Sequence, residues 1–256
     1  MQLVSPDQYL QAILDREAVD TGLNSPLRKA QLWLAPTLQK WGGQWLVSVH
    51  PSGSFMKGTA NKSGTDIDLF ISLSEETAES LKEIHATLFN ALTDAKFAPK
   101  RQNVSLNISL MGHSVDLVPG KRQNALLSDH SLYRRKADTW TKTNVITHIN
   151  HVAASAYRRE MRILKLWRNQ KNLDLPSFYL ELTVMKALAG QSAVFLSQNV
   201  QLAFEYLRDS FAAARVVDPA NTNNIISDDL TLAEKQKISA AAKAAREAPY
   251  WSQIVQ

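Results

Sequence analysis

The sequence contains no cysteine in its 256 residues, which excludes disulfides and thiolate metal sites. It also lacks an apolar run long enough to span a bilayer, because the best candidate, residues 175–190, is interrupted by Glu181 and Lys186. The N-terminus has no basic start followed by an apolar block, so no secretion signal is expected. These absences favour a cytoplasmic protein that does not insert into a membrane.

Acidic residues are scarce in the middle of the chain. The protein as a whole has a net charge of +5 and 45% apolar residues, which is ordinary for a globular protein. Residues 96–171, however, are rich in Lys and Arg, and their acids are only Asp116, Asp129, Asp138 and Glu160. This local excess of positive charge indicates partners that carry phosphate, although a solvated basic surface is the alternative.

Apolar periodicity predicts a mixed first half and a helical second half. We expect helices over 6–19, 25–41 and 74–95, the last capped by Ser74, strands over 44–53 and 65–73, and a hairpin over 103–120 that turns at Gly112 and His113. Helices are expected over 144–170, 176–190, 199–217 and 231–248, with a polar loop at 218–230. The predicted fold is α+β, with a mixed-sheet domain at 1–140, an all-helical domain at 141–256 and a ligand cleft between them.

Two aspartates interrupt the apolar strand at 65–73. Residues two apart in a strand point to the same face, so Asp66 and Asp68 should project together while Ile67 and Leu69 pack on the other side. Adjacent buried carboxylates need a counter-charge. Oxygen ligands of this kind suit Mg²⁺, with Mn²⁺ as a second option.

A third carboxylate stands in the second strand of the hairpin. Asp116 has apolar Val115 and Leu117 on either side, so its side chain should point away from the core. If this strand pairs with the strand of Asp66 and Asp68, three carboxylates come together. Three carboxylates can hold two metal ions on the order of 4 Å apart, which is the arrangement that performs in-line nucleotidyl transfer.

A glycine-rich segment precedes the aspartates. Gly53 and Gly58 allow a close backbone approach or a positive φ. Ser54 offers a hydroxyl and a backbone N–H, and clustered amides of this kind bind anions. The order is informative: Gly-Ser, about a dozen residues, Asp-x-Asp in an apolar strand, then a single Asp in a later strand.

This order resembles the nucleotidyltransferase superfamily that includes DNA polymerase beta. The segments "GSFMKGTANKSGTDIDLFISL" and "VDLVPG" are similar to those of archaeal-type CCA-adding enzymes and of the oligoadenylate and cyclic-dinucleotide synthases. "MRILKLWRNQ" followed by "LPSFYLELTVMKAL" resembles the helix pair that these families place across the cleft, and "DPANTNN" resembles one of their loops. The resemblance covers about residues 46–248 and implies a polymerase-beta-like core followed by a helical domain.

The resemblance also implies roles for individual residues. Asp66, Asp68 and Asp116 would be the catalytic metal ligands, with Asp116 nearest the attacking hydroxyl. The nucleotide contacts would be Gly53, Ser54, Lys57, Thr65, Lys165, Ser177 and Tyr179. Two alternatives stay open from the residues alone, because Lys165 could be a surface lysine and Tyr179 could be a core residue.

Three functions are compatible with the sequence. The first is a template-independent nucleotidyltransferase that uses ATP or other nucleoside triphosphates to make a short oligonucleotide or a cyclic nucleotide. The resemblance implies a signal in bacterial anti-phage defence, with an effector protein encoded alongside as a possible partner. The second is an enzyme that adds nucleotides to an RNA or tRNA 3′ end. The third is an inactive nucleotide sensor, which the intact set of Asp66, Asp68 and Asp116 argues against.

Overall fold

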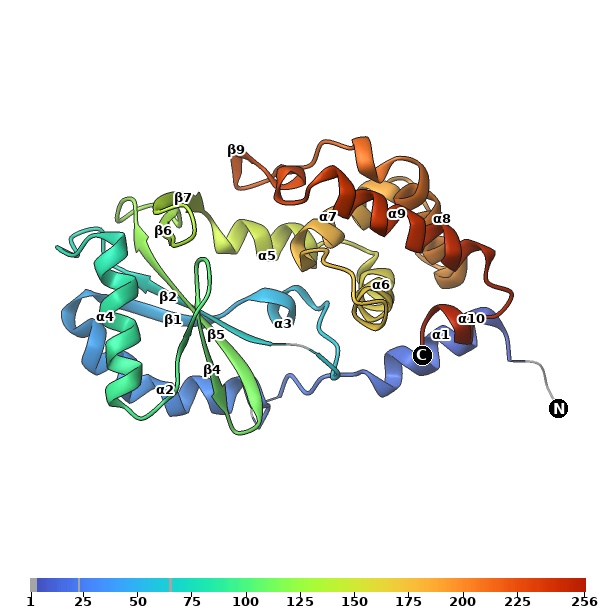
Figure 1. The fold of residues 1–256 in the computed structure, drawn as a ribbon. Helices are drawn as coiled ribbons and strands as arrows, with labels where there is room; N and C mark the ends of the chain where they lie inside the picture. The colour runs from blue at the N-terminus through green and yellow to red at the C-terminus, as the bar shows by residue number, and fades with distance from the viewer. Residues whose placement is uncertain (1–3, 23, 65) are drawn as a thin grey trace. The chain divides into compact units, whose positions relative to one another are not determined.

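The computed structural model describes residues 4–22, 24–64 and 66–256, and the chain in it forms two compact units (Figure 1). The sheet unit contains residues 20–58 and 65–150. The helical unit contains residues 1–19, 59–64 and 151–256. The α+β fold expected from the sequence is confirmed, since a mixed sheet comes first and a mostly helical region follows.

A seven-stranded sheet organises the sheet unit. Its order is β1(Leu46–Pro51), β2(Ile67–Leu73), β5(His113–Arg122), β4(Leu106–Leu110) and β3(Lys100–Arg101). The strands β6(His130–Arg134) and β7(Thr139–Thr143) continue from β5. Only β2 and β5 pair in parallel among these neighbours, and the other ladders of the described strands are antiparallel. The sheet is therefore mixed, as predicted, although β3, β6 and β7 were not expected.

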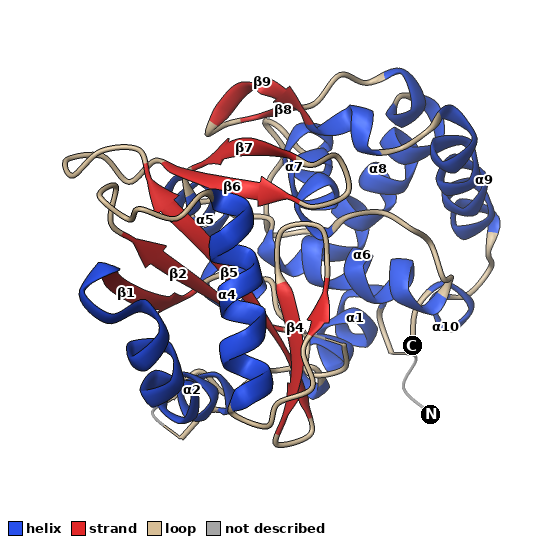
Figure 2. Ribbon diagram, turned by 60° about the vertical axis from the view of Figure 1, so that its left-hand side comes forward, coloured by secondary structure: helices blue, strands red, loops and turns tan. Residues whose placement is uncertain are grey.

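One face of this sheet is apolar and carries two helices, α2(Pro26–Gly42) and α4(Leu81–Asp94) (Figure 2). Alternate residues of β2 and β5 pack there with helix leucines such as Leu34 and Leu88. The strand residues in this core include Ile67, Leu69, Ile71, Val115 and Leu117. Because strand side chains alternate, the residues between them belong to the opposite face. That face holds the predicted carboxylates.

Two short helices complete the sheet unit. The helix α3(Gly53–Lys57) connects β1 to the segment before β2, where the sequence predicted a loop. The helix α5(Val145–Ala153) follows β7, and its first residues belong to the sheet unit. The β4–β5 turn consists of Met111 and Gly112, both with positive φ, rather than of Gly112 and His113. Positive φ at both central residues matches the twist that a two-residue hairpin needs.

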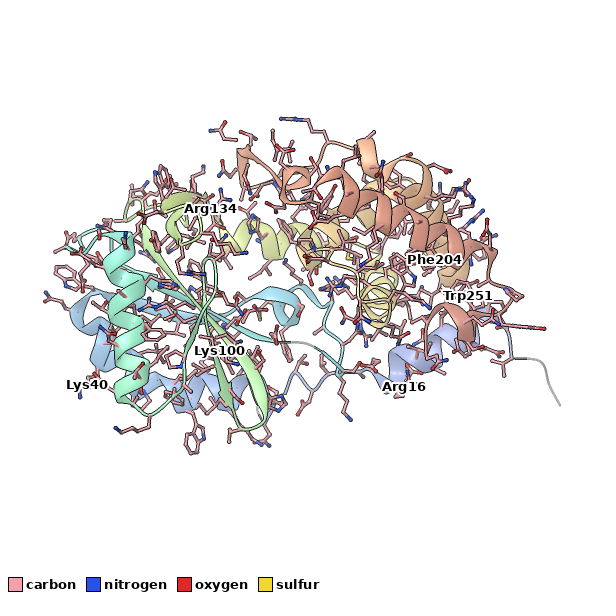
Figure 3. All side chains as sticks on the ribbon, viewed as in Figure 1. Arg16, Lys40, Lys100, Arg134, Phe204 and Trp251 are labelled. Carbon is pink, nitrogen blue, oxygen red and sulfur yellow. The ribbon has the colours of Figure 1, made fainter. Side chains whose placement is uncertain are left out.

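The helical unit contains α1(Pro6–Arg16), α6(Arg158–Gln170), α7(Ser177–Ala187), α8(Leu196–Asp209), α9(Leu232–Glu247) and α10(Trp251–Ile254). Its core includes Trp167 against Phe204, with ring centroids 5.0 Å apart; Figure 3 labels Phe204. The N-terminal helix packs in this core through Leu10 and Leu14, whereas the sequence analysis placed it with the catalytic domain.

Further differences from the sequence predictions lie in the second half of the chain and at the start of α4, and the helix expected over 199–217 is α8, Leu196–Asp209. The second half is not all-helical, because β8(Val217–Asp218) and β9(Asn221–Ile225) form a hairpin within the predicted loop. The expected helix 144–170 is two helices, α5 and α6. Helix α4 begins after Ser80, not Ser74, because Ser80 and Glu83 make a reciprocal capping box that satisfies two backbone N–H groups.

Across the described part of the chain, no helix combines the length and the hydrophobicity needed to cross a membrane.

Candidate active site

Asp68 and Asp116 are direct neighbours on adjacent parallel strands. The β2–β5 register pairs Asp68 with Asp116 and continues through Phe70 and Val118. Both aspartates are half-buried, while the residues on either side of each are in the core. The sequence predicted this pairing only on condition that the two strands are adjacent, and the structure meets that condition.

Asp66 lies immediately before β2 and is exposed. Burial raises the pKa of Asp116, and the charge of Asp66 raises it further. Within residues 4–22, 24–64 and 66–256, however, no group of three or more His, Asp or Glu side chains is arranged to hold a metal ion by itself. The structure thus brings Asp68 and Asp116 together in register, while the joint ligation by all three aspartates stays a prediction.

Asn107 is a neighbour of Asp116 that the sequence analysis did not identify. Its Nδ2 donates hydrogen bonds of 2.7 Å to Asp116 Oδ1 and of 2.7 Å to Ser114 Oγ. Burial raises the pKa of Asp116 above its ordinary value, and the bond from Asn107 opposes this rise by favouring the carboxylate. Asn107 was missed because a turn at Gly112 and His113 would place it opposite Val118, whereas the observed turn at Met111 and Gly112 places it opposite Asp116.

The segment around Gly53 lies against Asp68. Gly53 has a φ of +60°, and a Cβ added there would lie 1.7 Å from Asp68 Oδ2. The backbone N–H of Ser52 donates a 2.8 Å hydrogen bond to the carbonyl of Asp68. Gly58 ends α3 with a φ of 70°. The expectation that Gly53 and Gly58 serve close approach and positive φ is confirmed.

Two of the predicted nucleotide contacts lie in this same region of the sheet unit. Ser54 is half-buried in the first turn of α3. Lys57 is buried at the end of the same helix. Thr65 lies outside the described residues. The contacts of Ser54, Lys57 and Thr65 with a nucleotide stay predictions.

Lys165 is buried in the helical unit, so the surface alternative for this lysine is wrong. It is 5% exposed, and its Nζ lies 2.6 Å from Glu181 Oε1. The hydroxyl of Thr59 accepts a 2.8 Å hydrogen bond from Lys165 and donates one of 2.6 Å to Glu181. This network joins α6, α7 and the 59–64 segment within one unit.

Ser177 and Tyr179 also belong to the helical unit. Ser177 is exposed at the start of α7, and its hydroxyl accepts a 2.9 Å hydrogen bond from Arg168. Tyr179 is 0% exposed and packs against Phe211 at 5.0 Å, and burial raises its pKa to about 12. This position agrees with the core alternative for Tyr179, because no face of the ring is open to a base.

The side chains around Asp68 suit a hard divalent cation. The predicted ligands are all carboxylate oxygens, which Mg²⁺ and Mn²⁺ prefer. The bond from Asn107 helps to keep Asp116 ionised, as a metal ligand must be. On this chemistry the residues fit the expected metal.

The chain is similar in sequence to known proteins. Residues 37–139 match the family described as a nucleotidyltransferase domain. The chain is also 27% identical over 202 residues to a cyclic AMP-AMP-AMP synthase of Escherichia coli (strain MS 115-1). That match covers 70% of this chain and 63% of the synthase. The expected resemblance to polymerase-beta-like nucleotidyltransferases is confirmed.

Solved structures share the fold over almost the whole chain. The complex of CdnC with HORMA-deltaN from E. coli MS115-1 superposes with a TM-score of 0.77 at 20% identity, covering 98% of this chain and 96% of that one. The CD-NTase CdnG of Bradyrhizobium diazoefficiens, in complex with GTP, has a TM-score of 0.77 at 14% identity, covering 97% and 95%. Because both identities are low, 20% and 14%, the similarity shows that the fold is shared and carries no further conclusion.

Proposed function

We propose that this protein, whose residues 37–139 match the nucleotidyltransferase domain family, transfers nucleoside monophosphate units from nucleoside triphosphates to a hydroxyl group. Pyrophosphate is the leaving group, and no template is needed. The observation that carries the proposal is the register of β2 with β5, which places Asp68 beside Asp116 on the face opposite the core. Gly53 also packs against Asp68, so the segment that begins at Gly53 is close enough to bind a triphosphate held near the aspartates.

The proposed roles follow from these positions. Asp66, Asp68 and Asp116 would hold two Mg²⁺ ions, or Mn²⁺, and bound metal would lower the pKa of the attacking hydroxyl and neutralise charge on the phosphates. Asn107 holds Asp116 in place through the bond to Oδ1. The segment that begins at Gly53 would bind the terminal phosphates through Ser54, with Lys57 and Thr65 nearby in sequence. Lys165 and Ser177 are the candidate triphosphate contacts of the helical unit.

The proposed product is a short oligonucleotide or a cyclic nucleotide that acts as a signal in bacterial anti-phage defence. Its support is the sequence similarity to a cyclic AMP-AMP-AMP synthase. A protein of this function would act with an effector encoded alongside it.

A second candidate function is the addition of nucleotides to an RNA 3′ end. It is favoured by exposed basic residues of the sheet unit, among them Lys100 on β3 and Arg135 and Lys136 after β6. A basic surface of this kind can follow a nucleic-acid backbone. RNA dependence with a steep salt slope would identify this activity.

One experiment tests both candidates. The purified protein is incubated with each ribonucleoside and deoxyribonucleoside triphosphate and Mg²⁺, with and without RNA, and the products are identified by mass spectrometry. The first function predicts pyrophosphate and short or cyclic products without RNA, whereas the second predicts extended RNA. The Asp68→Asn variant is the control and should release no pyrophosphate. Undiminished release by that variant would contradict the carboxylate site.

A further inference from the structure

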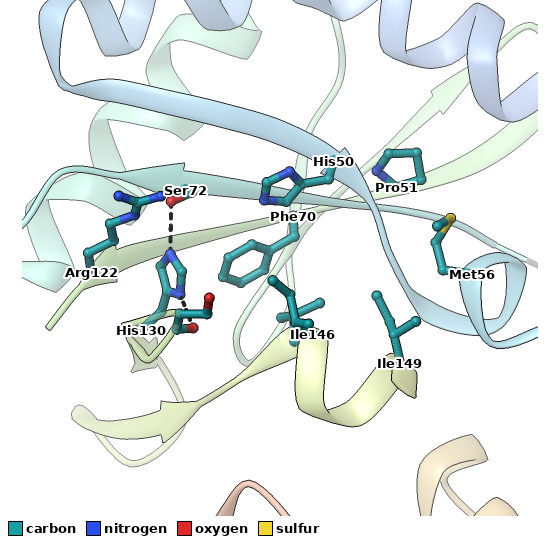
Figure 4. A pocket seen from close by; sticks show the side chains of 11 residues that line it. His50, Pro51, Met56, Phe70, Ser72, Arg122, His130, Ile146 and Ile149 are labelled. Atoms are coloured by element: carbon teal, nitrogen blue, oxygen red, sulfur yellow. Dashed lines mark hydrogen bonds between the residues drawn. The ribbon is translucent and has the colours of Figure 1, made fainter. Parts of the chain in front are cut away.

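A pocket lies on the carboxylate face of the sheet unit (Figure 4). We call it the α5 pocket, because Val145, Ile146 and Ile149 of α5 line one side of it. Its volume is about 320 Å³, within the roughly 300–1,000 Å³ of small-molecule sites. All its lining residues belong to the sheet unit.

The pocket and the carboxylates occupy the same face of the sheet. Phe70 and Ser72 line the pocket and follow Asp68 on β2 by two and four residues. Arg122 lines it from β5, six residues after Asp116. At about 3.3 Å per residue, Phe70 lies roughly 7 Å along the strand from Asp68. A nucleoside with its ribose near the carboxylates therefore reaches the Phe70 end of the pocket with its base, and Arg122, roughly 20 Å along β5 from Asp116 at the same rise, meets that base through its extended side chain.

The walls of the pocket suit a flat, largely apolar ring. The rings of His50 and Phe70 are parallel, with an interplanar angle of 4°, and His130 meets Phe70 edge-on at 4.8 Å. Gly120 leaves room for this arrangement, because a Cβ there would lie 2.6 Å from Phe70 Cζ. Ile146 is 51% exposed and stands at the opposite wall.

At the polar end of the pocket, the ring donor of His130 and the hydroxyl of Ser72 are already used within the protein. His130 Nδ1 lies 2.9 Å from the carbonyl of Ser128 and must donate to it, because a carbonyl only accepts. In the neutral ring Nε2 is then an acceptor, and it accepts a 2.8 Å hydrogen bond from the hydroxyl of Ser72. Burial lowers the pKa of both His50 and His130, and the charge of Arg122 lowers both further. These imidazoles are therefore neutral at neutral pH.

Arg122 is then the charged donor of the pocket. Its Nε is buried and has no hydrogen-bond partner among the described residues. No acidic side chain lines the pocket in that part of the chain. A buried donor without a partner is costly, so a ligand with hydrogen-bond acceptors at this end would be stabilised.

We propose that the α5 pocket binds the base of the nucleotide that supplies the attacking hydroxyl, and that Arg122 selects guanine over adenine. Guanine presents two acceptors, N7 and O6, on one edge, which matches a guanidinium, whereas adenine presents an amino donor beside N7. Arg122 is on the same strand as Asp116, the aspartate assigned to the attacking hydroxyl. This inference rests on the proposed function and adds a base preference to it.

Equilibrium binding tests the inference without turnover. GMP, AMP, guanosine and inorganic phosphate are titrated into the full-length protein by calorimetry, without metal. We expect GMP to bind about ten- to hundredfold more tightly than AMP. The Arg122→Gln variant should lose this preference, and Arg28→Gln, the same change at an exposed position on α2, should keep it.

Two further measurements distinguish recognition of the base from simple binding of an anion. Guanosine should compete with GMP, and inorganic phosphate should not. Ile146→Trp places a large ring at the exposed wall and should weaken the binding of GMP, with an unchanged thermal midpoint as the check on folding. Equal affinity for GMP and AMP, a preference that survives in Arg122→Gln, or displacement by phosphate alone would each overturn the inference.

The outcomes for this pocket and for the proposed function are separable. If the protein releases no pyrophosphate but binds GMP selectively through Arg122, the pocket assignment stands and the enzymatic proposal fails. If the protein makes products without any Arg122-dependent preference for guanine, the enzymatic proposal stands and the pocket assignment fails.

Discussion

Asn107 lies directly opposite Asp116 in the β4–β5 ladder and donates a 2.7 Å hydrogen bond to its Oδ1. The same amide group also donates to Ser114 Oγ, so its orientation is fixed by two acceptors on the neighbouring strand. A carboxylate that must bind metal gains from such a partner, because the bond both orients it and favours its ionised form.

The Asn107→Ala variant should therefore lose activity while keeping the fold. We expect pyrophosphate release to fall by about ten- to hundredfold, and the Mg²⁺ concentration for half-maximal activity to rise. Ser109→Ala is the matched control, because Ser109 is exposed on the same face of β4. Equal Mg²⁺ dependence of the Asn107 variant and wild type would show that the amide has no part in positioning Asp116.

Gly53 should be intolerant of a side chain for a reason that goes beyond its backbone conformation. Both Gly53 and Gly112 have positive φ, so Ala at either position costs about 1–2 kcal/mol in backbone strain. Only at Gly53 would the added Cβ meet Asp68, at 1.7 Å from Oδ2, whereas at Gly112 it meets nothing within 4 Å. We therefore expect Gly53→Ala to abolish most pyrophosphate release and Gly112→Ala to leave it intact.

Thermal unfolding of Gly53→Ala and Gly112→Ala measures how much stability each variant loses, for comparison with its loss of activity. If both lose activity in proportion to their loss of stability, the contact between Gly53 and Asp68 has no specific role.

The sequence was sufficient to predict that Asp68 and Asp116 lie on the face opposite the core. The alternation of Ile67, Asp68 and Leu69 determined which face each side chain takes, and the structure agrees. The sequence did not show that β2 and β5 pair in parallel, because strand adjacency depends on contacts distant along the chain. Asn107 was missed for a local reason, because the hairpin turn was predicted at Gly112 and His113, and only the observed turn at Met111 and Gly112 places Asn107 opposite Asp116.

The environment of Lys165 could not be predicted from its own helix. The pattern of α6 allows a surface lysine, but Glu181 of α7 and Thr59 enclose its ammonium group. The start of α4 was predicted six residues too early, after Ser74 instead of Ser80. Ser74 and Ser80 are both possible caps, and only the pairing of Ser80 with Glu83 satisfies two backbone groups at once.

Replacing Lys165 by Met should destabilise the protein strongly, because it removes the ammonium group that lies 2.6 Å from the buried carboxylate of Glu181. The expected loss is about 3–5 kcal/mol in the free energy of unfolding, measured by urea denaturation. The double variant Lys165→Met with Glu181→Leu removes both charges and should recover most of this loss. Lys186→Met, at an exposed position of α7, is the control and should change stability by no more than about 0.5 kcal/mol.

The same double variant tests the nucleotide role of Lys165. If Lys165 contacts the triphosphate, the double variant, although its stability is restored, should show a raised apparent KM for the nucleotide. An unchanged KM at restored stability would make the lysine a structural residue only.

Glu160 should make the stability of the protein depend on pH. It is 0% exposed in the helical unit, its Oε1 accepts a 2.9 Å hydrogen bond from Asn199, and its Oε2 has no partner among the described residues. Burial raises the pKa of Glu160 above the ordinary value of 4.5. The folded protein therefore keeps a proton that the unfolded chain releases near pH 4.5, so stability falls as the pH rises through this window.

The Glu160→Gln variant removes this titration while keeping the acceptor for Asn199. We expect it to match wild type at pH 4.5 and to be more stable at pH 7.5, by at least about 1 kcal/mol, because the buried amide carries no charge whereas the buried carboxylate does. Urea denaturation at pH 4.5, 6.0 and 7.5 measures the difference, with Glu76→Gln as the exposed control. A difference that stays constant across the three pH values would contradict the raised pKa, because only a titrating carboxyl makes the gap grow with pH.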